Sequence, residues 1–195
     1  ARSCPTRVAK ELEEEGKNFS SKSYDLELKV RAIVDQQEKN GFAFNLREAM
    51  SFLATLEEEQ HDLENQAQEM FKPREVQLKT KVKYIPFNIA SRKQIAERLQ
   101  ELGWKPKKKT DKGNVIVSEE ILDTINMPEA KMFSRYFLLQ KRTGLIKAWI
   151  EACQDDDKVR GRVMTLRTIT GRMAHNSPNM AQVPAVYSPY GKECR

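Results

Sequence analysis

Apolar residues recur at helical spacing through the first three quarters of the chain. In residues 24–40 the positions that share one helical face are Leu26, Val30, Ile33 and Val34. This spacing predicts a helix that ends at the turn dipeptide Asn40–Gly41. A second helix is predicted from its N-cap, Asn45, to about Phe71, with Glu48 as the reciprocal capping partner. We expect these two helices to pair antiparallel as a protruding hairpin.

Residues 73–86 are basic and rich in helix-breaking residues, and we interpret them as a connector. Ser91 then predicts the N-cap of a third helix, with Gln94 as its capping partner. Gly103 is suited to the C-terminal stop of that helix. A basic loop follows, so this part of the chain alternates helices with charged connections.

Ser118 is expected to cap a short helix over residues 119–125, and Pro128 opens a longer one that Gly144 weakens or bends. After this helix the alternating stretch 159–169 is typical of a strand or hairpin. Two strands alone are marginal. The last forty or so residues are therefore expected to begin a sheet-containing domain rather than to complete one.

Composition fits a folded and highly charged protein, with 195 residues, 39% hydrophobic and 32% charged. No apolar run approaches the roughly 20 residues that cross a bilayer, so we expect no membrane segment. Cys4, Cys153 and Cys194 lie too far apart for a zinc or redox motif. Their odd number suits a reducing cytoplasm. The chain begins with Ala and has no signal peptide, which suggests a processed fragment.

Positive charge is concentrated in three runs, although the net charge is only +6. The runs cover residues 79–83, 105–112 and 160–172. Any one of them is as well explained by a solvated surface. Three runs in one half of the chain favour a polyanion as partner.

The segment TITGRMAHNSPNMAQVP, Thr168 to Pro184, resembles the signature at the thumb–palm junction of family A DNA polymerases, the relatives of bacterial DNA polymerase I. The run PNMAQVPAVYSPYGKECR is similar to the phage replicative branch of that family. Two upstream stretches agree with it. Residues 87–114 resemble the thumb segment, and residues 36–45 resemble the turn that enters the thumb.

The resemblance implies a division of the chain into a lead-in (residues 1–23), thumb and palm-entry helices (24–153) and the first part of the palm (154–195). The implied fold is mainly α: a helical thumb subdomain with a long antiparallel helical hairpin. A short β-hairpin and an irregular segment then begin an α+β palm. The long thumb insertion of some phage relatives and the upstream exonuclease domain have no counterpart here.

In the family, the catalytic carboxylates and the lysine-bearing fingers helix follow the part that this chain resembles. The resemblance therefore implies no catalytic and no metal-binding residue in this chain, and Mg²⁺ is expected only in the complete polymerase. Asp155–Asp157 are consecutive, and we interpret them as a solvated turn. The expected function is the primer–template-binding portion of a DNA-directed DNA polymerase in a phage-infected or bacterial cell. It would be inactive alone and would need a partner polypeptide with palm and fingers, as in a split polymerase.

The resemblance also implies which residues contact DNA. They are Arg172, Thr170, Gly171, Asn179, Gln182, Asn88, Ser91, Lys141, Arg142, Lys107 and Lys108. Arg172 is expected in the minor groove, where base pairs offer similar acceptors and readout carries little sequence information. A surface salt bridge is the alternative for Arg172, and hydrogen bonding within the loop is the alternative for Asn179 and Gln182.

Two other function classes stay open on sequence grounds. One is a non-catalytic DNA-binding accessory protein derived from a polymerase. The other is a structural helical protein whose basic runs only keep it in solution.

Overall fold

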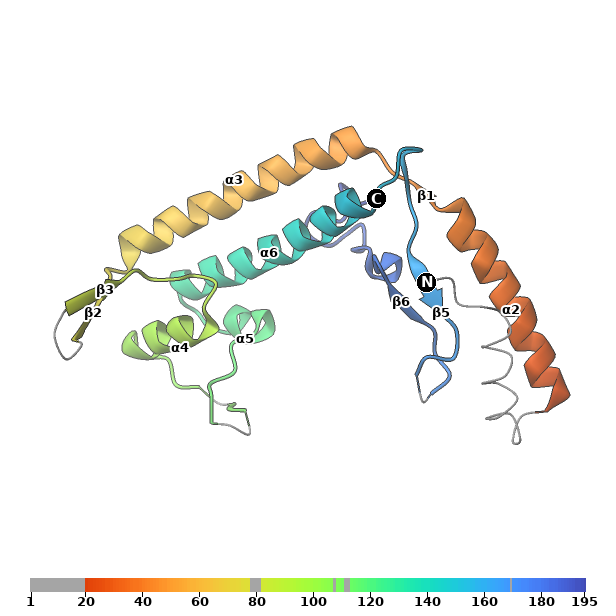
Figure 1. Ribbon diagram of the computed structural model, residues 1–195. Coiled ribbons are helices and arrows are strands. Elements are labelled where there is room, and N and C mark those ends of the chain that lie inside the picture. The colour runs from red at the N-terminus through yellow and green to blue at the C-terminus, as the bar shows by residue number, and fades with distance from the viewer. Residues whose placement is uncertain (1–19, 78–81, 107, 111–112, 169) are drawn as a thin grey trace. The chain divides into compact units, whose positions relative to one another are not determined.

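The structure is a computed structural model that describes residues 20–77, 82–106, 108–110, 113–168 and 170–195 (Figure 1). The chain divides into two compact units, each built from two stretches of sequence. Unit 1 comprises residues 1–44 and 152–183, and unit 2 comprises residues 45–151 and 184–195. The boundaries expected from the sequence, after residues 23 and 153, divide the chain into consecutive segments. Each of the two units, in contrast, joins two separate segments whose residues are in contact.

The described elements are mostly helices, with small antiparallel sheets. Those of unit 1 are α2 (Ser21–Asn40), β1 (Phe42–Ala43), β4 (Lys158–Val159), β5 (Arg162–Met164), β6 (Ala174–Asn176) and the 3₁₀ helix η2 (Met180–Gln182). Those of unit 2 are α3 (Leu46–Met70), β2 (Arg74–Gln77), β3 (Val82–Ile85), α4 (Arg92–Glu101), α5 (Glu119–Asp123) and α6 (Pro128–Ala152), whose last residue falls in unit 1. The expected combination of helices with small antiparallel sheets is confirmed, and helices make up about half of the chain.

Side-chain caps fix where the helices begin, and the predicted caps are confirmed. Asn45 accepts a hydrogen bond from the Glu48 amide at 3.2 Å, and Ser118 caps α5 in the same manner. Ser91 caps α4, but the Gln94 side chain accepts from the Asn88 amide at 2.8 Å instead of returning to Ser91. The predicted capping box at α4 is therefore only half formed.

One sequence interpretation needs correction. Residues 73–86 contain the antiparallel β2–β3 hairpin, with Arg74 opposite Ile85, and are not a plain connector. Its β-branched and aromatic residues favour strands, and the prolines and lysines around them obscured this pattern. The helix α6 continues through Gly144, and because glycine lowers helix stability by a modest amount, the prediction that Gly144 weakens this helix stays open.

In unit 1, side chains from α2 complete the bonding of a two-stranded sheet. The strand β5 pairs with β6, and Val163 lies opposite His175. The backbone of Val163 is also bonded by α2: Arg31 donates to its carbonyl at 2.8 Å, and Glu38 accepts from its amide at 2.7 Å. A sheet of only two strands is marginally stable. The Arg31 and Glu38 side chains bond backbone groups of β5 that a third strand would otherwise bond.

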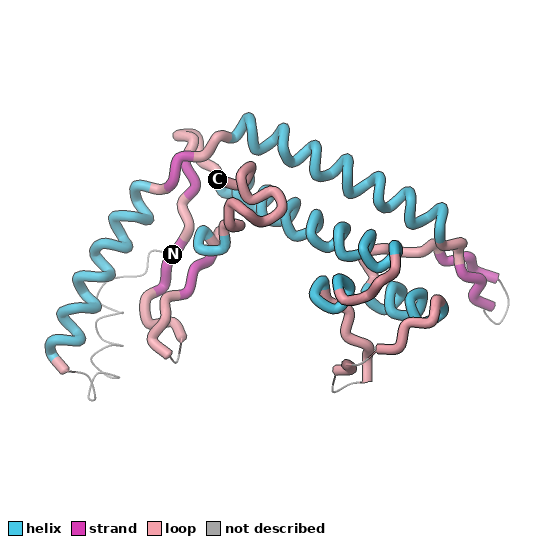
Figure 2. The backbone as a smooth tube through the Cα atoms, turned by 180° about the vertical axis from the view of Figure 1, so that it is seen from behind, coloured by secondary structure: helices cyan, strands magenta, loops and turns pink. Residues whose placement is uncertain are grey.

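In unit 2, α3 and α6 lie side by side and antiparallel (Figures 1 and 2). Contacts between them join Glu57 to Lys147 at 2.6 Å and Glu64 to the Tyr136 hydroxyl at 2.8 Å. Within unit 2, the antiparallel partner of α3 is therefore α6. The predicted hairpin of residues 24–40 with residues 45–71 would join α2 of unit 1 to α3 of unit 2, and it stays a prediction.

The core of unit 2 lies where the end of α3 and the start of α6 meet α4 and α5. Three rings from distant parts of the sequence, Phe71, Phe87 and Phe133, meet with centroids 4.7 to 5.8 Å apart. Leu99 and Leu122 are fully buried beside them. Within the described residues, no helix combines the length and apolar character needed to cross a membrane.

Candidate nucleic-acid interface

Arg172 lies on a tight turn whose backbone is fixed by Thr168. The Thr168 hydroxyl accepts from the Arg172 amide at 2.8 Å and donates to the Arg172 carbonyl at 3.1 Å. It also contacts the Thr170 hydroxyl at 3.1 Å, and the Gly171 amide donates to the Thr168 carbonyl at 2.9 Å. Gly171 has a φ of 72°, in the region that glycine adopts without strain.

The Arg172 side chain is exposed and makes no hydrogen bond or ion pair with the described residues. The salt bridge considered as its alternative role is thus not seen among them. An arginine offers five N–H donors in a planar fork. A fixed backbone with a free guanidinium is the arrangement that suits an external ligand. Thr168, which the sequence interpretation left out of the site, supplies the brace, and its spacing of four residues from Arg172 is the signal for this role.

Asn179 and Gln182 differ in how far the fold uses their amides. The Asn179 side-chain oxygen accepts from the Ala181 amide at 3.0 Å and so caps η2. Gln182 is exposed, and the described residues give its side chain no partner. Hydrogen bonding within the loop therefore accounts for the side-chain oxygen of Asn179. Among the described residues it does not account for the side-chain amide of Gln182.

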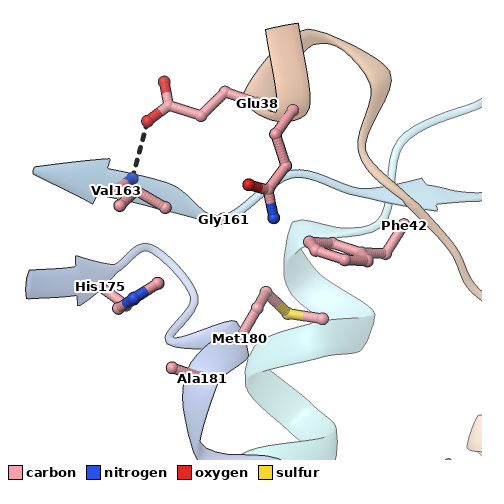
Figure 3. A pocket seen from close by; sticks show the side chains of 8 residues that line it. Glu38, Phe42, Gly161, Val163, His175, Met180 and Ala181 are labelled. Atoms are coloured by element: carbon pink, nitrogen blue, oxygen red, sulfur yellow. Dashed lines mark hydrogen bonds between the residues drawn. The ribbon is translucent and has the colours of Figure 1, made fainter. Parts of the chain in front are cut away.

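The segment that carries Asn179 packs closely against Gly161. A Cβ atom placed on Gly161 would lie 2.7 Å from the Pro178 carbonyl oxygen and 2.8 Å from Met180 Cγ. Beside this contact is a cavity of about 230 Å³, lined by Glu38, His175 and other residues (Figure 3). In this view Met180 and Phe42 lie on one side of the cavity and Glu38 bonds Val163 across from them. Gly161 thus sets the position of the loop that presents Asn179.

On unit 2, Asn88 and Ser91 form the turn that enters α4. The Asn88 side chain accepts from the Ala90 amide at 2.9 Å, and Ser91 caps the helix. A cavity of about 330 Å³ opens beside them, and Lys93 and Gln94 are among its lining residues. Helix N-termini favour anions because their first amides lack partners and the dipole is positive there.

The remaining predicted basic residues have different surroundings. Lys141 forms an ion pair with Glu119 at 2.9 Å. Arg142 donates to the Pro189 carbonyl at 3.2 Å and to the Ser188 hydroxyl at 3.5 Å. Lys108 is exposed, and Lys107 lies outside the described residues. Within the described part of the chain, Lys141 is therefore ion-paired, Arg142 is hydrogen-bonded to neutral acceptors, and Lys108 has no such partner.

Arg142 belongs to a set of contacts that hold residues 184–195 on α3 and α6. Arg135 pairs with Glu59, and both bond the Tyr190 hydroxyl. The Arg135 guanidinium also lies over the Tyr190 ring, 4.8 Å from its centroid. Burial, with the Glu59 hydrogen bond, raises the pKa of Tyr190 to about 12. We refer to Glu59, Arg135 and Tyr190 as the Tyr190 cluster.

The acidic residues Asp155–Asp157 form a turn, as predicted. Arg160 bonds both carboxylate oxygens of Asp156, at 2.9 and 2.5 Å, which lowers the pKa of that carboxyl. A carboxylate engaged in this way does not suit a metal pair. Among the residues that the structure covers, no three His, Cys, Asp or Glu side chains are grouped so as to hold a metal ion.

The sequence of the chain is similar to those of DNA polymerases. The family model described as DNA polymerase family A matches residues 52–195. The DNA-directed DNA polymerases of Escherichia phage T7 and Enterobacteria phage T3 are each 40% identical to the chain over 126 residues. That match covers 60% of this chain and 18% of either relative, so the chain spans less than a fifth of their length.

A solved structure shares the fold. It is the POL domain of Pol1 from M. smegmatis, in complex with DNA primer-template and dNTP. Its TM-score is 0.73, at 17% sequence identity, over 87% of this chain and 28% of that chain.

Proposed function

Because this chain belongs to DNA polymerase family A, we propose that it forms the primer–template-binding portion of a DNA-directed DNA polymerase. The observation that carries the proposal is the exposed Arg172 on the turn braced by Thr168, inside the segment matched by the family model. Residues 24–153 form the thumb and palm-entry helices in this proposal. Residues 154–195 begin the palm.

Arg172 is proposed to lie in the minor groove at the primer terminus. Every base pair presents acceptors there in similar places. A guanidinium that donates to these acceptors senses the geometry of a base pair without selecting its sequence. Such a contact suits an enzyme that copies any template.

The other contacts are proposed to fix the duplex without reading it. Gln182 and the side-chain NH₂ group of Asn179 contact the DNA strands next to Arg172. Asn88, Ser91 and Lys108 on unit 2 contact phosphates, where attraction is independent of sequence and weakens with salt. Lys141 and Arg142 already have partners within the chain, so we expect smaller contributions from them.

The catalytic carboxylates, and the Mg²⁺ ions that they hold, are proposed to belong to palm and fingers segments outside these 195 residues, on a partner polypeptide in a split enzyme. The relatives are more than five times as long as the matched region, which leaves ample sequence for those parts. Mg²⁺ would supply charge stabilisation for phosphoryl transfer.

The test is the affinity of the chain for a labelled primer–template, measured by fluorescence anisotropy at several salt concentrations. Arg172→Ala is expected to weaken binding by about tenfold with little change in the salt slope, since a base-edge contact costs about 1–3 kcal/mol. Lys108→Ala is expected to lower the salt slope by about one. Arg167→Ala removes a charge from the same exposed loop and serves as the matched control.

A second arm adds Mg²⁺ and nucleotides to the same primed template. The chain alone is expected to extend no primer. Primer extension by this chain alone would contradict the proposal that the catalytic residues lie in other segments. Equal losses for Arg172→Ala and Arg167→Ala would show that only charge matters at this loop.

A further inference from the structure

A cleft of about 750 Å³ lies in unit 2, beside the loop between α4 and α5. Its apolar lining consists of Trp104, Ile116, Ile121, Ile125 and Met127. This volume falls within the range of binding pockets, about 300–1,000 Å³. The DNA-binding proposal uses only Lys108 among its lining residues.

The cleft is built on fixed backbone. The Trp104 amide donates to the Leu99 carbonyl at 2.8 Å, which ties the cleft to the end of α4. The Met127 amide donates to the Ile125 carbonyl at 2.9 Å, at the turn into α6. Ile125 is buried, whereas Trp104 and Ile121 are only partly buried and pack against the core. The apolar surface is therefore held in place while part of it faces solvent.

The rim carries positive charge that the fold does not neutralise. Lys105 and Lys108 are exposed, and neither forms an ion pair with the described residues. Lys141, in contrast, is paired with Glu119. A single acidic side chain, Glu120, lines the cleft.

We propose that this cleft binds a short peptide segment of a partner protein, with large apolar side chains next to acidic residues. The apolar side chains would occupy the space between Trp104 and Ile121, and the acidic ones would pair with Lys105 and Lys108. Grooves of this kind recognise peptides through a few apolar anchors, while charge directs encounter and orientation.

The lining favours a peptide over a nucleic acid. Bases stack on flat aromatic faces, and four of the five apolar side chains here are aliphatic. The proposal goes beyond DNA binding, since a peptide site would recruit another protein to this part of the polymerase.

The probe is a fluorescein-labelled twelve-residue peptide in which Phe and Leu alternate with Asp and Glu, with a Lys-substituted peptide as the charge-reversed control. We expect saturable binding of the acidic peptide only. The double variant Lys105→Glu with Asn126→Glu, both at exposed cleft positions, should weaken it by about tenfold, as expected for reversed interfacial charge. Lys93→Glu, outside the cleft, should change it less than about twofold.

Intrinsic fluorescence locates the site independently. The chain has two tryptophans, and Trp149 is buried, so Trp149→Phe leaves Trp104 as the only tryptophan and therefore the only source of tryptophan fluorescence. Peptide addition should shift its emission to the blue; if this variant does not fold, the anisotropy series decides alone. Binding of both peptides alike, or unaffected by the double variant, would overturn the proposal. So would complete displacement of the peptide by a single-stranded oligonucleotide, because the cleft would then be nucleic-acid surface.

The DNA arm separates the two proposals. Asn126→Glu alone should weaken the acidic peptide and leave primer–template affinity unchanged. Peptide binding without DNA binding would contradict only the proposed function, and DNA binding without peptide binding would contradict only this inference.

Discussion

Thr168 holds both backbone hydrogen-bonding groups of Arg172 with a single hydroxyl. This brace orders the residue that we assign to the minor groove before DNA arrives. A backbone that is already ordered loses less conformational entropy on binding. The affinity assigned to Arg172 should therefore depend on Thr168, although Thr168 itself contacts no ligand in our account.

Thr168→Val tests this dependence because it keeps the shape of the side chain and removes the hydroxyl. Primer–template affinity is expected to fall by about 1 kcal/mol, or roughly fivefold, as for the loss of one hydrogen bond. Thermal stability should change little, since the turn is exposed. Thr165→Val is the matched control in the same hairpin, and an equal effect of both substitutions on affinity would contradict the role of Thr168.

We predict opposite effects on stability for glycine-to-alanine substitutions at Gly161 and Gly144. Gly161→Ala would force a Cβ against the Pro178 carbonyl and Met180, and should destabilise unit 1 by about 1–3 kcal/mol. Gly144→Ala, exposed within α6 with no atom near the added Cβ, should stabilise by about 0.5–1 kcal/mol. Urea denaturation of both variants checks this, and similar signs would rule out the close contact at Gly161.

At the scale of elements, the sequence predicted what is encoded locally. The caps Asn45, Ser91 and Ser118 were predictable because a capping side chain bonds an amide three residues away. Long-range partners were not predictable in the same manner. The hydrogen bonds from α2 to Val163 join residues more than 120 positions apart, and no local sequence pattern predicts them.

The difference between local patterns and long-range partners also explains which parts of the candidate site could be predicted from the sequence. Arg172, Thr170 and Gly171 fall in one short motif, and they form one turn. Lys141 and Arg142 were assigned to DNA from their local sequence. Their partners Glu119 and Ser188 lie more than twenty residues away, so the sequence could not indicate that these charges are already engaged.

The Tyr190 cluster makes a pH-dependent contribution to unit 2. The folded pKa of Tyr190 is raised from 10.0 to about 12 by burial and Glu59. The unfolded chain therefore releases this proton first, and stability falls as pH rises from about 10 towards 12. Below pH 10 the contribution is fully present.

Tyr190→Phe removes both the hydroxyl contacts and the titration. At pH 9 it should be less stable than the native chain by about 1–3 kcal/mol, because Glu59 and Arg135 lose a partner. At pH 11 the difference should be smaller, since only the native chain loses stability through this group. Urea midpoints at both pH values measure it, with Tyr187→Phe, at an almost fully exposed position, as control. A difference that does not change with pH would contradict the raised pKa.

At the scale of the whole molecule, the chain carries a net charge of +6 and belongs to a family of DNA polymerases. Charge alone would let any basic surface bind DNA, with an affinity that only salt controls. The distinguishing claim is that one side chain, Arg172, donates to a base edge. That claim predicts a coupling between Arg172 and a specific atom of the DNA.

The most direct test replaces the purine at the primer terminus by its 3-deaza analogue, which lacks the minor-groove N3 acceptor. For the native chain this change should weaken primer–template binding by about tenfold or more, because a lost hydrogen bond to a charged group costs about 1.5–3 kcal/mol. For Arg172→Ala the same change should have almost no effect, because the two changes remove one shared interaction. If both proteins lose affinity equally, or neither does, Arg172 does not contact the primer terminus and the central claim is wrong.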